Sequence, residues 1–499
     1  MTDRLEELTS WHADWSGLRV AVLGLGVTGF AAADTLIELG AEVLVVADRA
    51  DPQRANLLDV LGGSLVAGGD ADGQVRAVAG FAPDVLVVSP GYHPDSPLLR
   101  AAAEAGTPVW GDIDLAWRVR DKTGTPAEWI AVTGTNGKTT TVRLVTAMLQ
   151  EAGTRAIACG NIGVPVLDAV RDPAGFDVLV VELSSYQLHW TELVSPWASV
   201  CLNVADDHLD WHGSAEAYAA AKGRVYERTQ VACVYNLDDP TTERLVRDAD
   251  VREGARAIGF GLSIPGPSDL GIVEGILCDR AFLEDRQRTA LELTTVQELH
   301  DAGLSAPHVV SNVLAASALA RSLDVTPDVI RRTLQTFRLD PHRIELVAEQ
   351  DGVRWVDDSK ATNPHAADAS LGAFDSVVWV VGGLLKGVDI GDLVRSRAGR
   401  IRAAVVLGTD RSAVLDAFAR HAPAIPVHQV TAGETGQVMP EVVRLAAAAA
   451  QPGDVVLLAP AAASMDQFDD YGHRGREFQS AVLQLLGGVT DDPDAPAPA

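Results

Sequence analysis

Cysteine and basic residues are scarce in this sequence, and each scarcity excludes a class of protein. The four cysteines (Cys159, Cys201, Cys233 and Cys278) are scattered and form no Cys-x-x-Cys pair, which is typical of reduced, mostly buried thiols in a cytosolic protein. The 40 lysines and arginines face 68 acidic residues, which gives a formal net charge of −28. Nucleic acids and anionic membranes need a positive surface, so neither is expected as a partner.

Long apolar runs are also missing. No run is long enough to cross a bilayer, and the acidic N-terminus lacks a signal-peptide core, so membrane insertion is not expected and the cytoplasm is the expected compartment. A length of 499 residues suggests about three domains of common size. In so acidic a chain, anionic ligands must be bound by local cations and helix ends.

A glycine-rich turn in the middle of the chain predicts a phosphate-binding loop. An apolar run predicts a strand before Gly134, and Lys138 opens a helical pattern. Gly134 and Gly137 allow backbone N–H groups to face an anion, Lys138 can reach terminal phosphates, and the Thr139 hydroxyl can hold magnesium. Val132 stands where the general motif has its first glycine, so an ordinary turn with a solvated lysine remains the alternative.

A second glycine motif lies near the N-terminus. Residues 19–23 predict a strand, followed by the G-x-G-x-x-G pattern Gly24–Gly29 and, about twenty residues later, Asp48. Alone, this pattern favours an NAD-binding domain. The glycines can equally seat a uridine diphosphate, with Asp48 accepting from a ribose or base. A third strand, 84–88, runs into Ser89 at the same predicted sheet edge.

Further polar residues follow predicted strands in the middle segment. Glu182 ends a buried strand at 176–181, where nucleotide triphosphatases hold magnesium, although a solvated strand end is the alternative. The strand at 198–203 leads to Asp206–His212, which is either a metal-binding cluster or a hydrated loop. Lys222 lies in a helix, where a solvent-facing side chain is the default expectation.

The last segment alternates strands and helices and predicts another α/β unit. Its strands are expected at 353–356, 377–381, 403–407, 427–430 and 455–459, and short strands are expected within 262–300. Three polar loops follow strands of this unit: 358–363, 382–386 and 463–468. Ligands of α/β sheets collect at such edges.

Together these motifs resemble one family, the Mur ligases. The matching stretches are Gly134–Thr140, Gly160–Gly163, Glu182–Gln187, Asp207–Gly213, Pro341–Arg343 and Asp358–Asn363. The similarity runs from Val20 to about Phe478. Asp358–Asn363 and Ser464–Phe468 are similar to the D-glutamate-adding members of the family.

The resemblance implies an α/β fold of three domains. These are an N-terminal Rossmann-like domain for a UDP-linked substrate (1–122), a central P-loop ATPase domain with a mostly parallel sheet (123–340), and a C-terminal Rossmann-like domain for ATP and the amino acid (341–489), with a disordered tail at 490–499. It therefore reverses the first interpretation of Gly24–Gly29, which would bind UDP and not NAD.

The resemblance also implies the reaction and its partners. ATP would phosphorylate the L-alanine carboxylate of UDP-N-acetylmuramoyl-L-alanine, and the D-glutamate amine would displace the phosphate through a tetrahedral intermediate. Two magnesium sites and a carbamylated Lys222 are expected, in a monomer. The catalytic residues would be Lys138, Glu182, His208 and Lys222, and the metal ligands Thr139, Glu182, His208 and Lys222.

The binding residues are carried over from the family in the same way. ATP would be bound by Gly134, Thr135, Asn136, Gly137, Lys138, Thr139, Thr140, Asn312, Arg343 and Asp358. The UDP substrate would be bound by Gly26, Val27, Thr28, Asp48, Arg49, Ser89, Asn161, Ser184 and Gln187. D-Glutamate would be bound by Thr362, Lys386, Ser464 and Tyr471.

Some positions depart from the family pattern. Val309 stands where asparagine is expected, Leu384-Leu385 replace a more polar pair before Lys386, Arg49 follows Asp48 where threonine is familiar, and Tyr471 replaces phenylalanine. Three alternatives stay open. A folylpolyglutamate synthase would lack the N-terminal glycine motif, an NAD oxidoreductase would leave the phosphate loop unused, and a non-catalytic scaffold need not retain the lysines and metal ligands.

Overall fold

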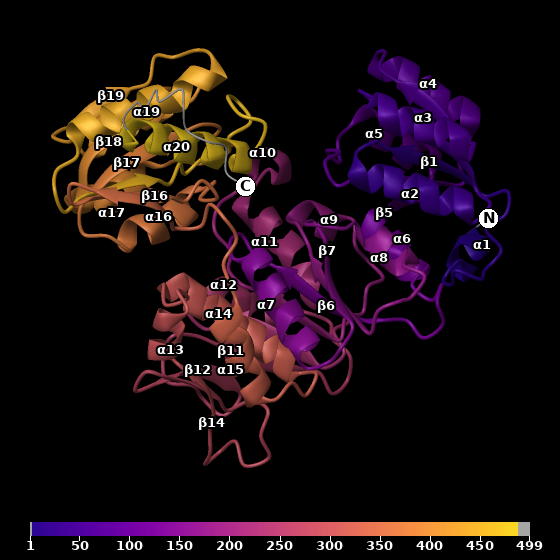
Figure 1. Ribbon diagram of the computed structural model, residues 1–499. Helices are drawn as coiled ribbons and strands as arrows, with labels where there is room; N and C mark the ends of the chain where they lie inside the picture. The colour runs from indigo at the N-terminus through magenta and orange to yellow at the C-terminus, as the bar shows by residue number, and fades with distance from the viewer. Residues whose placement is uncertain (1, 488–499) are drawn as a thin grey trace, which may run out of the picture. The chain divides into compact units, whose positions relative to one another are not determined.

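Three β-sheets organise the protein (Figure 1). The computed structural model describes residues 2–487, so the tail predicted at 490–499 lies outside the described residues. The predicted α/β class is confirmed, and the three sheets are mostly parallel. Backbone contacts define two compact units, one running to Val204 and resuming over Glu216–Phe337, the other containing Ala205–Ala215 and continuing from Arg338. Within residues 2–487, no helix is long and apolar enough to cross a membrane.

The first sheet has five parallel strands in the order β3-β2-β1-β4-β5. Its strands are β1 (Arg19–Leu23), β2 (Glu42–Ala47), β3 (Ser64–Ala67), β4 (Val85–Val88) and β5 (Val109–Gly111). Its helices are α1 (Thr2–Glu7), α2 (Val27–Glu38), α3 (Pro52–Leu61), α4 (Ala71–Phe81), α5 (Pro97–Ala105) and α6 (Asp112–Arg118). β1 is buried apolar sequence, as expected for a central parallel strand. Strand order reverses beside β1, and ligands bind at such points.

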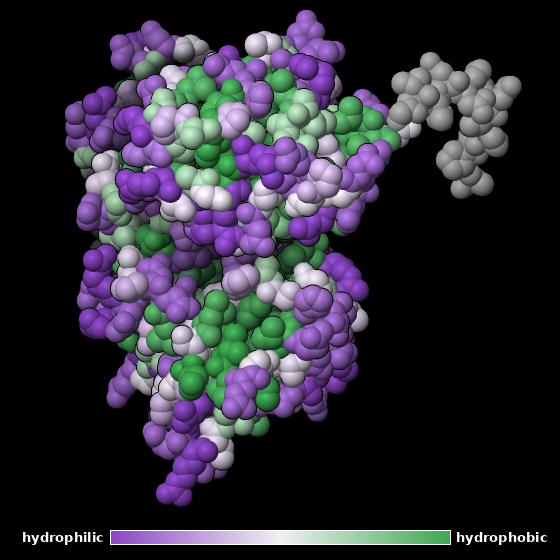
Figure 2. Space-filling view, turned by 90° about the vertical axis from the view of Figure 1, so that its left-hand side faces the viewer, coloured by the Kyte–Doolittle hydropathy of each residue, from purple (hydrophilic) through white to green (hydrophobic). Residues whose placement is uncertain are grey.

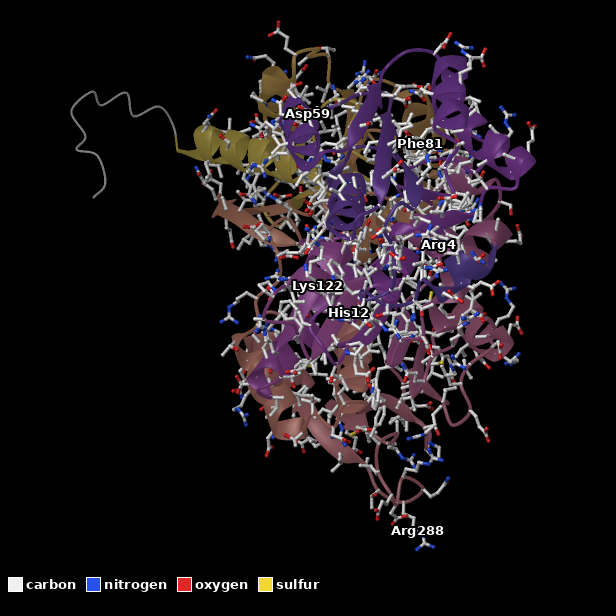
Figure 3. The ribbon with its side chains drawn as sticks, turned by 90° about the vertical axis from the view of Figure 1, so that its right-hand side faces the viewer. Arg4, His12, Asp59, Phe81, Lys122 and Arg288 are labelled. Carbon is white, nitrogen blue, oxygen red and sulfur yellow. The ribbon has the colours of Figure 1, made fainter. Side chains whose placement is uncertain are left out.

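The second sheet has nine strands in the order β14-β13-β12-β11-β10-β9-β6-β8-β7. Its strands are β6 (Glu128–Thr133), β7 (Ala156–Gly160), β8 (Val178–Glu182), β9 (Ala198–Cys201), β10 (Ala232–Asn236), β11 (Arg256–Phe260), β12 (Asp269–Val273), β13 (Ile276–Asp279) and β14 (Leu291–Thr295). The pairings of β7 through β12 are parallel, and β13 and β14 add an antiparallel edge. Figure 3 shows Arg288 at the tip of the loop between β13 and β14.

Helices accompany this sheet along the chain. They are α7 (Lys138–Glu151), α8 (Val166–Arg171), α9 (Ser185–His189), α11 (Ala215–Gly223), the 3₁₀ turn η1 (Arg224–Tyr226), α12 (Pro240–Asp248), α13 (Val296–Asp301), α14 (Pro307–Arg321) and α15 (Pro327–Thr336). The short helix α10 (Leu209–His212) lies between α9 and α11 in the chain but belongs to the second unit. The buried face of α14 begins at Val309 and continues to Ala320, because nearly every residue between them is apolar.

Contacts within the first unit join the first sheet's helices to the second sheet's. Arg171 on α8 pairs with Asp34 (2.6 Å) and Glu38 (2.9 Å) on α2, and Lys122 pairs with Glu38 (2.5 Å). Nearby, the Gln187 amide on α9 donates to a carboxylate of α6. One hydrophobic cluster contains residues from both sheets, so the two share a continuous core.

The third sheet has six strands in the order β15-β16-β20-β17-β18-β19. Its strands are β15 (Glu345–Gln350), β16 (Val353–Asp357), β17 (Val377–Gly382), β18 (Ile401–Leu407), β19 (Val427–Gln429) and β20 (Val455–Leu458). Its helices are α16 (Pro364–Gly372), α17 (Gly391–Arg397), η2 (Ala398–Arg400), α18 (Ser412–His421), α19 (Thr435–Ala449) and α20 (Tyr471–Leu486). Within this sheet β15 pairs antiparallel and the other pairings are parallel, so the predicted α/β unit is confirmed with one extra edge strand.

Apolar and polar side chains are interspersed on the face shown in Figure 2. Single exposed apolar residues such as Ile264 (78% exposed) are ordinary on a soluble surface. All four cysteines are buried free thiols, as predicted.

Candidate active site

The loop between β6 and α7 adopts a shape that requires its glycines. Gly134 has φ 151° and Gly137 has φ 85°. A Cβ atom on Gly137 would lie 2.3 Å from Oδ1 of Asn312, and one on Gly134 would lie 2.9 Å from Cβ of Leu202. The predicted ATP-binding residue Asn312 therefore lies directly against the loop, although it is far away in sequence.

Two lysines donate to the same carbonyl of this loop. Lys138 Nζ donates to the carbonyl oxygens of Gly134 (2.9 Å) and Thr135 (3.0 Å). Lys222 Nζ also donates to Gly134 O, at 2.8 Å, and lies 4.7 Å from the centre of the Tyr218 ring. Lys222 is 1% exposed, so its default solvent-facing interpretation is wrong. Helix α11 turns Tyr218 and Lys222 into the interior, and only the tertiary contact with the loop reveals this.

A buried carboxylate lies beside the start of α7. Glu182, at the end of β8, is 2% exposed, so the alternative of a solvated strand end is wrong. Its Oε2 accepts from the Thr139 hydroxyl (2.9 Å), and its Oε1 accepts from the Asn161 amide (2.8 Å). A hydroxyl and a carboxylate are the oxygen ligands that Mg²⁺ takes next to phosphates, so these residues fit such an ion.

The remaining predicted residues of this region have structural partners. Asn136 N–H donates to Oδ1 of Asn203 (2.9 Å), which holds the loop against the end of β9. Ser184 and Gln187 form a capping box at the start of α9, and Gln187 Nε2 donates to Asp112 (3.1 Å). Burial raises the pKa of Asp112 to about 6, against the opposing effect of the Gln187 hydrogen bond. Thr140 is 4% exposed within α7.

A cavity of about 420 Å³ opens at the edge of the first sheet. It is lined by Asp48, Ala71, Gln74, Ser89, Gly91, Tyr92, His93, Ser96, Pro97 and Leu98. Asp48 and Ser89 are predicted substrate residues that the fold brings together from the ends of β2 and β4. Beside them, a Cβ on Gly24 would lie 2.7 Å from Ser89 Oγ, and one on Gly29 would lie 2.1 Å from Gly24 O. The glycine motif therefore permits close packing at the cavity wall.

The other predicted UDP-binding residues lie at the start of α2 and after β2. Gly26 is the N-cap of α2, Val27 is 54% exposed at its first position, and Thr28 follows, half-buried. Arg49 is exposed after Asp48. An open helix N-terminus with exposed backbone suits a diphosphate.

The second unit contains the predicted metal ligand His208. This residue has a left-handed backbone (φ 54°) at the start of α10, and its Nε2 lies 3.6 Å from Asp207 Oδ2. The other carboxylate oxygen of Asp207 pairs with Lys386 Nζ at 3.4 Å. Lys386 itself has φ 53° in the loop after β17. The predicted D-glutamate lysine and the predicted metal-ligand loop are therefore linked by an ion pair.

Asp358 is a buried carboxyl at the end of β16. It accepts hydrogen bonds from the Ser370 hydroxyl and from the N–H of Ile344 (3.3 Å). Burial raises the pKa of Asp358 to about 7, while the Ser370 hydrogen bond and the charge of Arg343 lower it. Asp358 and Arg343 thus lie close together, as expected of residues predicted to act on one ligand.

The predicted D-glutamate residues lie on loops that meet at the edge of the third sheet. The loop after β17 pairs with the loop after β20 through two hydrogen bonds of 2.9 Å between Leu384 and Ala463, next to Ser464. Tyr471 begins α20, and its carbonyl accepts from Ser359 (2.8 Å). Thr362 N–H donates to Lys360 O (2.8 Å) in the loop after β16. The structure brings Thr362, Ser464 and Tyr471 to one edge.

Sequence reasoning missed two buried polar residues at these edges. Arg474 is 0% exposed, and its guanidinium donates to Ser359 Oγ (3.0 Å), Ser359 O (2.8 Å) and Ala462 O (3.1 Å). Burial lowers its pKa to about 10. Gln74 lines the first-sheet cavity. Neither residue lies in a recognisable motif, and burial of a polar helix residue leaves no local signal.

All three parts of the chain match domains of one family. Residues 18–111 match the MurD-like N-terminal domain of Mur ligases, residues 132–320 the Mur ligase middle domain, and residues 342–462 the Mur ligase glutamate ligase domain. A UDP-N-acetylmuramoylalanine–D-glutamate ligase of Leifsonia xyli subsp. xyli is 65% identical over 98% of this chain and 97% of its own. A second ligase of the same name, from Streptomyces coelicolor, is 52% identical over 95% of this chain and 99% of its own.

Solved structures share the fold. The MurF ligase from Thermotoga maritima in complex with ADP matches with a TM-score of 0.54 and 19% identity, over 95% of this chain and 96% of that one. A pseudomurein peptide ligase type C from Methanothermus fervidus matches with a TM-score of 0.57 and 17% identity, over 94% and 100%.

Three α/β sheets and a phosphate loop with a buried glutamate beside it define a multidomain P-loop protein. The sequence identity to these ligases over nearly the full chain narrows that class to one family. The chain belongs to the Mur ligase family.

Proposed function

We propose that this chain is the ATP-dependent ligase that adds D-glutamate to UDP-N-acetylmuramoyl-L-alanine in the synthesis of peptidoglycan precursors. The observation that carries the proposal is 65% identity, over nearly the whole chain, to a relative named for this reaction. The intact phosphate loop with its two lysines and Glu182 supports an active enzyme. Because these groups serve catalysis, a non-catalytic scaffold would not need all of them.

The chemistry proceeds in two steps. The L-alanine carboxylate attacks the γ-phosphorus of ATP, ADP leaves, and an acyl phosphate forms. The D-glutamate amine then attacks the acyl carbon, loses a proton, and expels phosphate from a tetrahedral intermediate. Lys138, whose amine donates to two carbonyls of the phosphate loop, would turn to the terminal phosphates of ATP and stabilise their charge. Thr139 and Glu182 would hold Mg²⁺, which would supply the positive charge that lets the γ-phosphate and the carboxylate approach each other.

Lys222 is proposed to be carbamylated. Its amine and that of Lys138 both lie within hydrogen-bond distance of Gly134 O. Two cations so close together repel each other in a buried site. Addition of CO₂ to Lys222 Nζ, with loss of two protons from the ammonium group, replaces one cation by an anion, which attracts Lys138 and provides oxygen ligands for a metal. His208 is proposed as a further metal ligand.

The remaining assignments follow the same proposal. The first sheet binds the UDP part through the α2 N-terminus, Asp48, Arg49 and Ser89, with Asn161, Ser184 and Gln187 nearer the reacting end. The third sheet binds D-glutamate through Thr362, Lys386, Ser464 and Tyr471. ATP is bound by the phosphate loop, Asn312, Arg343 and Asp358. We also propose domains 1–122, 123–340 and 341–489, and a cytoplasmic monomer.

Phosphate release from ATP tests the function directly. The purified chain would be assayed with magnesium and UDP-N-acetylmuramoyl-L-alanine, with D-glutamate compared against L-glutamate, L-alanine and a diamino acid. We expect release that depends on D-glutamate, with a new amide in the product. Release with another amino acid would overturn the substrate assignment, and no release with any would overturn the ligase.

A further inference from the structure

Gln74 is a buried amide at the back of the first-sheet cavity. It lies on α4 and is 5% exposed. Its Nε2 donates to Asp48 Oδ1 (3.1 Å) and, more weakly, to Gly68 O (3.4 Å). In Figure 3, the label Phe81 marks the C-terminal end of α4. Burying an amide is costly unless it is hydrogen-bonded, so this glutamine is used to bridge the loops after β2 and β3.

Asp48 receives its orientation from this contact. Among the residues that the structure describes, Gln74 is the only side chain that hydrogen-bonds its carboxylate. One oxygen accepts from Gln74, so the other is available to the cavity. Rotation of the carboxylate away from Gln74 would break this bond, so the contact favours the arrangement in which one oxygen faces Gln74 and the other does not.

Tyr92 provides an aromatic side chain in the same cavity. Its hydroxyl donates to Val46 O (3.3 Å), which ties the ring to β2. Burial, aided by the negative charge of Asp48, raises the pKa of Tyr92 to about 12, so the phenol stays neutral. A flat aromatic surface beside an acceptor-only carboxylate suits a planar base with an N–H on its edge.

Uracil and cytosine differ at that edge. The ring nitrogen N3 of uracil carries a hydrogen and donates, whereas N3 of cytosine is an acceptor. A carboxylate can only accept, so it pairs with uracil and repels the N3 lone pair of cytosine. Discrimination of this kind requires the carboxylate to be held in place.

We propose that Gln74 is a positioning residue that holds Asp48 where its carboxylate accepts the N3–H of uracil, so that Gln74 determines the preference for uridine over cytidine nucleotides. This inference rests on the proposed UDP site of the first sheet. The role is indirect, because Gln74 acts through Asp48.

Calorimetric titration of the full chain with UDP and CDP tests the proposal. Gln74→Met nearly preserves the volume and removes the donor, and we expect it to weaken UDP binding about tenfold with little effect on CDP. Asp48→Asn should abolish the preference. The double variant should lose no more than Asp48→Asn alone, because both changes remove one interaction.

Controls separate positioning from folding. Gln53→Met makes the same substitution at an exposed site on α3 and should leave both affinities unchanged. Gln74→Glu tests the contact without loss of volume, since two adjacent carboxylates repel, and it should also weaken UDP binding. Additive losses in the double variant, or an unchanged UDP preference in Gln74→Met, would overturn the role.

Failure of the proposed positioning role can be distinguished from failure of the proposed ligase reaction. Phosphate release that depends on D-glutamate is measured on the wild-type protein in parallel. If that activity is missing while the UDP preference depends on Gln74, the proposed reaction fails and the positioning role stands. If the enzyme is active but binds UDP and CDP equally, the positioning role fails alone.

Discussion

At the scale of single residues, the phosphate loop depends on two lysine amines, one of them buried, that donate to the same carbonyl oxygen. Lys138 belongs to the loop motif, whereas Lys222 lies on helix α11, more than eighty positions later in the chain. Their charges have different tasks in the proposed mechanism. Lys138 must remain a cation for the phosphate, and Lys222 must become an anion for the metal.

Removal of Lys138 should stop the reaction. Lys138→Ala deletes the cation at the terminal phosphates, and loss of one such group typically costs about 10²–10³ in kcat. Phosphate release at saturating substrate concentrations measures kcat. Lys122→Ala removes the same charge from the surface pair with Glu38 and should keep kcat near wild type. Full activity of Lys138→Ala would contradict the loop assignment.

The loss of activity caused by removal of Lys222 should be partly reversed by small carboxylates. Lys222→Ala lacks the proposed carbamate and should be nearly inactive, and added acetate or formate should restore part of the activity by supplying carboxylate oxygens. The same salts should not restore Lys138→Ala, because that variant lacks a cation. The carbamate proposal fails if Lys222→Ala retains normal turnover.

At the scale of elements, helix α7 is flanked by two glycines that both have a left-handed backbone but differ in their surroundings. Gly137 precedes α7, and its Cβ would meet Asn312, whereas Gly153 (φ 88°) follows the helix with nothing within 4 Å. This pair separates backbone strain from local crowding.

Alanine at the two glycines should therefore have different effects on ligand binding. Both variants should lose about 1–2 kcal/mol of stability from the left-handed backbone. Only Gly137→Ala should also weaken ATP binding, more than tenfold, because the new methyl group displaces Asn312 or the loop. Denaturant unfolding and ATP titration measure the two effects. Equal ATP affinity in both variants would show that the crowding at Gly137 is harmless.

Strand patterns explain why the elements were predictable. β1 and β17 are apolar in sequence because helices cover both faces of a parallel sheet, and their predicted bounds agree with the structure to within one residue. The antiparallel edge strand β15 was not among the predicted strands. Its half-exposed sequence, Glu345–Gln350, lacks the apolar run on which the other predictions depended.

At the scale of the whole molecule, stability should depend on the protonation of Asp358. Its pKa is raised by burial from an ordinary 3.8 to about 7, so the folded state binds this proton more tightly than the unfolded state. Its contribution to stability is therefore full below about pH 4, declines as pH rises towards 7, and does not change further above that.

Asp358→Asn should remove this pH dependence. The variant should be more stable than wild type by up to about 4 kcal/mol at pH 8, because the pKa of Asp358 is raised by about three units, and about equally stable at pH 4, because the amide is never charged. Thermal unfolding across that range measures it. Asp416→Asn, at an exposed position on α18, should follow the wild-type profile. An identical difference at pH 4 and pH 8 would contradict the assignment.

The α/β class, the phosphate loop, the strand-end positions of Glu182 and Asp358, and the family were all predictable from the amino-acid sequence. These features are local: a hydrophobic run, a glycine spacing or a short motif is visible without knowledge of distant residues. Their roles at the site remain predictions.

Which polar residues are buried, and what they contact, became visible in the folded arrangement alone. Lys222 at Gly134, Gln74 at Asp48 and Arg474 at Ser359 are contacts between residues distant in the chain. The grouping of Ala205–Ala215 with the second unit is of the same kind. Burial of a charged or amide side chain depends on the packing of other elements around it, and no neighbouring residue in the sequence records that packing.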